Sequence, residues 1–141
     1  MDLGEDAHAW IHLVLTRSKF AQALGIEVVE AEPDRVVLKM PFREEFTTVG
    51  AIVHGGAIAT LIDIAAASAS ASGIRDGEVA GGATASMNIS YLAAADGADL
   101  TAEAAIIQRS RRQTVADIDI RDQTGALVAK GVVTSRFVLK R

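Results

Sequence analysis

The first third of the chain predicts helix before it predicts strand. From Asp6 to Leu24 apolar residues recur every three or four positions, which is typical of one or two amphipathic helices. Ser18 lies where a second helix would take its cap, and Gly25 follows the last apolar residue as a stop signal. We therefore expect a short helical region at the start of the chain.

Two β-rich runs come next. Residues 26–31 and 35–42 are rich in β-branched and apolar side chains and flank Glu32-Pro33-Asp34, a turn sequence. This arrangement predicts a hairpin, which a connection over residues 46–53 joins to the following segment.

The middle of the chain predicts one long helix. It runs from about Gly56 to Ser72 and ends at Gly73, and its apolar residues point in every direction. The length of this segment alone would allow a membrane-spanning helix. Its polar residues, Asp63 among them, favour a buried helix of a globular protein instead. One sheet covers only one side of such a helix, so we expect an obligate dimer to bury the other side.

The remainder of the chain predicts strands. Apolar and polar residues alternate over 79–92, 100–108, 114–121 and 127–139, with turn residues between the last two runs. The predicted order is helix, two strands, one long helix and a meander of about four strands, which indicates an α+β fold. No linker or internal repeat interrupts it, so we expect a single domain over residues 1–141.

Composition narrows the class of protein. The formal net charge is −4, which does not favour nucleic acid or acidic membranes as partners. The chain has no cysteine, so disulfides, thiolate nucleophiles and cysteine-rich zinc sites are excluded. The first ten residues contain acidic side chains where an export signal would have Lys or Arg, and no export signal is evident. We therefore expect a cytoplasmic protein.

Asp63 is the strongest candidate for chemistry. It is the only formally charged side chain between Glu45 and Arg75, and it interrupts an apolar stretch. Burying an unpaired carboxylate costs several kcal/mol and raises its pKa, so we expect a general base or nucleophile here. The alternative is a structural carboxylate bonded to backbone N–H groups or hydroxyls.

His54, Gly55 and Gly56 stand at the predicted start of the long helix. Helix N-termini expose unpaired N–H groups, and glycine allows a ligand to approach the backbone closely. Such donors suit a developing oxyanion, although the glycines also suit a plain tight turn. His54 could orient this turn, bind substrate, act as an acid or base, or hold a backbone group.

Spacing separates these two groups. The seven residues from Gly56 to Asp63 correspond to roughly 10 Å of helix rise, whereas reacting groups must approach within about 3 Å. If the Gly55 N–H holds a carbonyl, the attacking carboxylate should come from Asp63 of another subunit. Gly56, Thr60, Asp63, Ala67 and Ser70 share one stripe that suits the wall of a narrow cleft.

Two further motifs have both functional and plain interpretations. Arg109-Ser110-Arg111-Arg112 lies at a predicted turn, where it would bind the phosphates of a large acyl carrier or form a solvated polar turn. His8 and His12 have helical i, i+4 spacing, but no third metal ligand accompanies them, and we expect no metal or cofactor.

Three motifs together carry a family resemblance: VHGGAIATLIDIAAA, ATASMNISYL and QRSRRQTVADIDIRDQTGALVAKGVVT. The chain resembles the hotdog-fold acyl-CoA thioesterases of the phenylacetate-degradation type, which are related to the 4-hydroxybenzoyl-CoA thioesterases. The resemblance implies a long helix wrapped by a curved antiparallel sheet, a homodimer and often a dimer of dimers. It also implies hydrolysis of an acyl-CoA thioester without metal or cofactor.

The resemblance assigns roles to individual residues. Gly55 N–H would polarise the thioester carbonyl, supported by His54, and Asp63 of the opposite subunit would activate water or attack directly. Thr84 matches a hydroxyl residue that positions water in some relatives, and the turn at 109–112 matches a segment near the CoA nucleotide.

One departure from the family pattern concerns Thr48, which stands where many relatives have Asn or Gln. An acyl-CoA-binding or sensing protein without turnover is therefore a second interpretation. Dehydration of 3-hydroxyacyl thioesters on the same fold is disfavoured, because Gly-Gly follows the histidine where dehydratases often have Phe-Pro.

Overall fold

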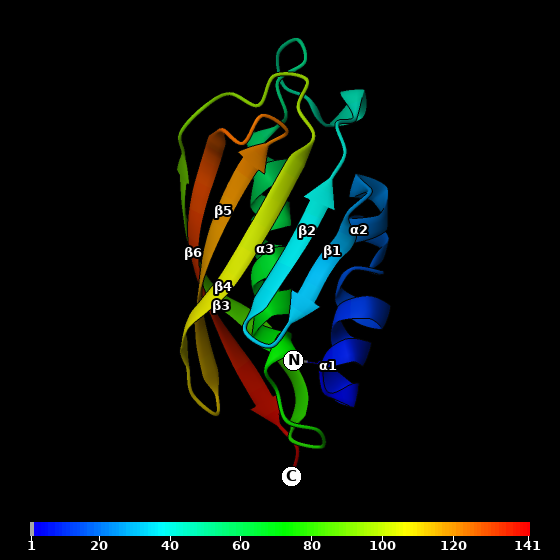
Figure 1. Cartoon of the computed structure of the whole chain (residues 1–141), viewed down its shortest axis with the longest axis vertical. Helices are drawn as coiled ribbons and strands as arrows, with labels where there is room; N and C mark the ends of the chain where they lie inside the picture. Colours follow the sequence, from blue (N-terminus) through cyan, green and yellow to red (C-terminus); the bar gives the residue numbers. More distant parts are fainter. Residues whose placement is uncertain (1) are drawn as a thin grey trace.

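The computed structural model describes residues 2–141 as one curled antiparallel sheet around a long helix (Figure 1). The helix, α3, spans Gly55–Ser72. The sheet has the strand order β1-β2-β4-β5-β6-β3. Its strands are β1 (Glu27–Glu32), β2 (Arg35–Met40), β3 (Val79–Tyr91), β4 (Leu100–Arg109), β5 (Gln113–Asp122) and β6 (Leu127–Leu139). The expected α+β hotdog architecture is confirmed.

Alternation along the strands builds the core. Thr114, Ala116, Ile118 and Ile120 of β5 are buried on the face toward α3, as the period of two predicts. Small residues let the helix approach closely: a Cβ added to Gly131 of β6 would lie 2.9 Å from Ile62 Cγ2. The contact between helix and sheet therefore depends on this glycine.

The amino-terminal region consists of three short helical pieces. These are α1 (Glu5–Ala9), a π-helix η1 (Trp10–Leu15) and α2 (Lys19–Leu24). Ser18 caps α2 by accepting a hydrogen bond from the Ala21 N–H (3.2 Å), and Gly25 ends it with φ +72°. The predicted cap and stop are confirmed, whereas the π-helix was not predicted.

The sheet is not alone in covering α3. The amino-terminal region covers part of α3 as well, because α1 and η1 both contact this helix. Ala7 of α1 and Ile11 of η1 are fully buried. Most of α3 is thereby buried within one chain. By length and composition alone, this helix would be long and apolar enough to cross a membrane. The expectation that a second subunit is needed to bury this helix was wrong, because a curled sheet and a short helical region already cover it.

The structural case for a second subunit lies at β3 instead. This strand pairs with β6 on one side and ends the strand order of the sheet. Residues 82–88 of β3 are exposed, and Met87 keeps 40% of its surface accessible. A long edge with unpaired backbone groups is a template for pairing with another strand.

Candidate active site

The first turn of α3 leaves one backbone donor free. His54 is the N-cap, and its Nδ1 accepts a hydrogen bond from the Gly56 N–H (2.7 Å). The His54 carbonyl accepts from the N–H groups of Ala57 (3.0 Å) and Ile58 (3.2 Å). The Gly55 N–H has no acceptor within residues 2–141. Among the first four helical amides, Gly55 alone therefore offers its hydrogen to a ligand.

The role of His54 at this turn is to bind backbone. Because Nδ1 accepts a hydrogen bond, a neutral imidazole in this geometry carries its hydrogen on Nε2. The ring is exposed, so that second nitrogen remains open to solvent or ligand.

Tyr91, the last residue of β3, is a site residue that sequence reasoning missed. Its hydroxyl donates to the Gly55 carbonyl (2.8 Å), and a Cβ on Gly55 would lie 3.4 Å from the tyrosine ring. The ring thus holds the Gly55 peptide in place. The contact joins residues 36 apart in sequence, so no local spacing indicates it.

A groove of about 430 Å³ surrounds the start of α3. Thr48 and Gly55 both line it, together with Tyr91. The structure thus brings together Thr48 and Gly55, two of the residues that the family resemblance selected.

Asp63 lies in the middle of α3 and faces β3. It is half-buried, and its Oδ1 accepts a hydrogen bond from Thr84 Oγ1 (2.5 Å). The expectation of a buried, unpaired carboxylate was wrong, because Asp63 faces the exposed edge of the sheet and accepts a hydrogen bond from a hydroxyl there, as the alternative interpretation expected. The structure does bring Asp63 and Thr84 together, as two candidates selected on separate motifs.

Asp63 and Thr84 line a cavity of about 340 Å³. Ala67 and Ser70 line it as well, so the predicted stripe on α3 is confirmed for its central and carboxyl-terminal members. Gly55 lines the separate groove described above and does not line this cavity. Within one chain, the free amide and the carboxylate therefore face different hollows.

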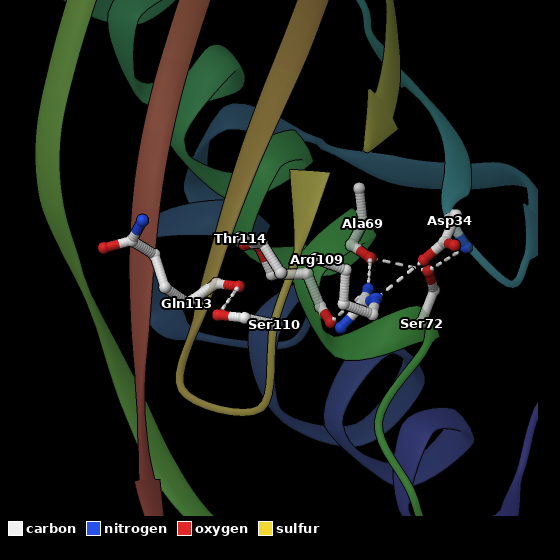
Figure 2. Close-up of polar contacts among 8 residues, drawn as sticks. Asp34, Ala69, Ser72, Arg109, Ser110, Gln113 and Thr114 are labelled. Atoms are coloured by element: carbon white, nitrogen blue, oxygen red, sulfur yellow. Dashed lines mark hydrogen bonds and ion pairs between the residues drawn. The ribbon is translucent and has the colours of Figure 1, made fainter. Parts of the chain in front are cut away.

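Arg109 is held by the end of α3 (Figure 2). Its guanidinium donates to Asp34 Oδ1 (2.8 Å) and to the carbonyls of Ala69 (3.2 Å) and Ser70 (2.9 Å). Cations stabilise helix C-termini in this way. A Cβ on Gly73 would lie 2.6 Å from the Arg109 guanidinium carbon, so the glycine leaves room for the arginine.

The other side chains of the arginine turn, residues 110–112, make no hydrogen bond to α3 within the part of the chain that the structure describes. Ser110 closes the turn through its N–H, which donates to the Gln113 carbonyl (2.8 Å), while Arg111 and Arg112 are exposed. A basin of about 320 Å³ lies beside this turn, and its charged lining residues are Arg75, Arg109, Arg111 and Glu78. We call it the basic basin. The exposed guanidinium groups of Arg111 and Arg112 are the ones available to an anionic ligand.

The two amino-terminal histidines stack on each other, with ring centroids 4.4 Å apart. Partial burial and the neighbouring His8 lower the pKa of His12 below its ordinary value. No cluster of three or more potential metal ligands occurs within residues 2–141.

Comparison with known proteins gives the chain a family. The Thioesterase superfamily matches residues 50–129, which contain the start of α3, Asp63 and Thr84. Human acyl-coenzyme A thioesterase 13 is 32% identical over 115 residues, covering 79% of this chain and 80% of that protein.

Solved structures agree on the fold. Zebra fish thioesterase superfamily member 2 superposes with a TM-score of 0.77 at 31% identity, covering 88% of this chain and 91% of that one. The E. coli PaaI protein, from the phenylacetic acid degradation operon, gives 0.85 at 25% identity, covering 97% and 96%.

Proposed function

This chain belongs to the thioesterase superfamily, and we propose that it hydrolyses an acyl-CoA thioester in a site shared by two protomers. One observation carries the proposal. The free Gly55 N–H and the Asp63 carboxylate line different hollows of the same chain, so each protomer holds half of a hydrolytic site.

The chemistry follows from the two halves. Gly55 N–H of one protomer donates to the thioester carbonyl oxygen, where negative charge develops during attack. Asp63 of the other protomer either takes a proton from water, which then adds to the carbonyl carbon, or adds to that carbon itself. In either route the tetrahedral intermediate expels the CoA thiolate as the C–S bond breaks, and the thiolate takes up a proton. Attack by water gives the carboxylic acid directly, whereas attack by Asp63 gives a mixed anhydride that a water molecule then hydrolyses to the acid and the free carboxylate. Both routes need an ionised carboxylate.

Strand β3 supports a specific way to join the halves. Thr84 beside Asp63 and Tyr91 beside Gly55 lie seven positions apart on this one strand. Antiparallel pairing of two β3 strands about a two-fold axis near Met87 and Asn88 would bring Thr84 of each protomer opposite Tyr91 of the other. The exposed edge is free for such pairing. We propose this homodimer, and a dimer of dimers built from it, as the working assembly.

The relatives support CoA thioesters as the substrate class. Human acyl-coenzyme A thioesterase 13 is named for that substrate, and the arginine turn offers exposed Arg111 and Arg112 to the CoA phosphates. The likeness to E. coli PaaI supports including phenylacetyl-CoA and other aryl thioesters among the substrates to test.

Thiol release from a panel of acyl-CoAs tests the function. Asp63→Asn removes the charge but keeps the shape, and we expect the rate to fall by about two to four orders of magnitude with folding intact. Circular dichroism of both proteins controls for folding. Saturable acyl-CoA binding without turnover of any substrate would instead identify a binding or sensing protein.

Mixed dimers test whether the site is shared. Gly55→Pro removes the N–H at a helix position that tolerates proline, and Gly55→Ala controls for the added carbon beside Tyr91. Asp63→Asn and Gly55→Pro should each be inactive alone, whereas coexpression of the two chains should restore about a quarter of the wild-type rate, because half of the dimers contain one intact site. A site contained within one chain would show no recovery.

A further inference from the structure

The cavity beside Asp63 has an apolar interior that the hydrolytic step itself does not use. We propose that it receives the acyl group of the substrate, and that Trp10 of η1 sets the size of acyl group accepted. This inference rests on the function proposed above. It commits to an uncharged aryl or medium-chain acyl group as the occupant.

The position of the cavity carries the first step. Asp63 and Thr84 stand in its wall, so a thioester carbonyl that Asp63 attacks lies at its opening. Its volume of about 340 Å³ is near the lower end of small-molecule pockets, which is suited to an acyl group and too small for CoA. Six large apolar residues line it: Trp10, Val14, Leu15, Ile64, Ile74 and Phe137. Arg136 lines it as well and is exposed.

The π-helix explains why three of these side chains come from one short segment. The Thr16 N–H donates to the Ile11 carbonyl (3.2 Å), five residues earlier, and its hydroxyl donates to the same oxygen (2.7 Å). Residues five apart lie above one another in a π-helix, whereas in an α-helix they point in different directions. The π geometry therefore places Trp10, Val14 and Leu15 together at the cavity.

This wall is anchored to the rest of the protein. The Asp6 N–H donates to Asp76 Oδ1 (2.9 Å), and the Gly77 N–H donates to Asp6 Oδ2 (2.8 Å). These paired bonds tie α1 to the loop after α3, and Ile11 fills the core from within η1. A fixed wall can discriminate between acyl groups by size, because it does not move aside for a larger group.

The lining of the cavity favours an uncharged occupant. Ile74 and Phe137 line both this cavity and the basic basin. A distal carboxylate would have to leave water to lie among mostly apolar side chains, which is unfavourable, and the one arginine of the lining, Arg136, is itself exposed to water. We therefore expect the cavity to disfavour an ω-carboxyacyl group that matches an accepted acyl group in length.

Trp10 also provides the measurement, since it is the only tryptophan of the chain. Its fluorescence reports on the cavity without any need for turnover. We expect hydrolysis-resistant alkyl-CoA thioethers of medium length to change its emission saturably. The methyl-length analogue and an ω-carboxyalkyl analogue should produce no saturable change at the same concentrations.

Three variants test the assignment by specificity. Trp10→Ala widens the cavity, and we expect it to shift the preference in kcat/KM toward longer acyl groups by roughly tenfold. Ala67→Leu narrows the cavity and should shift the preference toward shorter groups by a similar factor. Leu13→Ala is the matched control, because Leu13 lies in η1 but is 68% exposed and does not line the cavity. Trp10→Phe serves as the widening variant if Trp10→Ala does not fold.

The outcomes separate this inference from the proposed function. Turnover without a Trp10 response, or with preferences unchanged in both cavity variants, overturns the acyl pocket and leaves the hydrolase standing. A Trp10 response to thioethers without turnover of any acyl-CoA supports the pocket and removes the hydrolase. Failure of both measurements removes both.

Discussion

The two ends of α3 differ in whether their unpaired backbone groups are bonded. Every helix leaves unpaired N–H groups at its start and unpaired carbonyls at its end. At the end of α3, Arg109 donates to two of those carbonyls and to Asp34, and Gly73 makes room for it. At the start, His54 accepts hydrogen bonds from the N–H groups of the residues that follow Gly55, and the Gly55 N–H stays free. The closed end stabilises the protein, and the open end is available for chemistry.

Among changes at the two ends of α3, removing the free N–H of Gly55 should produce the largest effect. Gly55→Pro deletes the free N–H, and we expect kcat to fall by about 10²–10³ because one oxyanion donor is lost. Gly55→Ala keeps that N–H, places its Cβ in ordinary contact with Tyr91 and should lose far less. Thiol release at saturating substrate measures both. Equal losses in the two variants would show that crowding, rather than the hydrogen bond, explains the defect.

Opening the closed end should affect stability. Arg109→Ala leaves two helix carbonyls without their charged donor, and we expect the free energy of unfolding to fall by about 2–3 kcal/mol. Urea denaturation measures the change. Arg111→Ala is the comparison, because its exposed side chain should affect KM for acyl-CoA rather than stability. A raised KM with unchanged stability in Arg109→Ala would make Arg109 a substrate contact instead.

Tyr91 tests how firmly the open end must be held. Tyr91→Phe keeps the ring and deletes the hydroxyl that binds the Gly55 carbonyl, so the loss should be about 1 kcal/mol, or roughly fivefold in rate. We expect the loss mainly in kcat, because the hydroxyl positions the Gly55 peptide. A change confined to KM would contradict that positioning role.

His12 belongs to neither end of α3 and provides a small effect for reference. Its pKa is lower in the folded protein, through burial and the neighbouring His8, so its contribution to stability is present above the ordinary histidine value. That contribution is lost as pH falls through the folded pKa. His12→Gln should therefore weaken the decline in stability between about pH 7 and pH 5. Urea midpoints across this range measure it, and identical pH profiles would exclude His12 as a contributor.

Periodic parts of the fold could be predicted from the sequence. The alternation from Thr114 to Ile120 places four side chains in the core, and all four are buried. The start of the long helix was expected at about Gly56 and lies at Gly55, because capping residues carry a local signal. Local period and local turn chemistry are enough for such elements.

Contacts between distant residues could not be predicted in this way. Arg109 was interpreted from its neighbours in a turn, whereas its partners Asp34, Ala69 and Ser70 lie at least 39 residues away. The exposure of Asp63 depends on β3 being an edge strand, which periodicity does not reveal. The carboxylate and the glycine turn were found from the sequence because residue type alone marks them.

The exposed side of β3 also has a consequence for handling the protein. The exposed run 82–88 of this edge strand invites unspecific cross-β association whenever the chain is alone. Loss of the partner subunit at high protein concentration should therefore give turbid, aggregating samples rather than well-behaved, inactive monomers. The contact proposed to complete the catalytic centre would then also keep the polypeptide in solution.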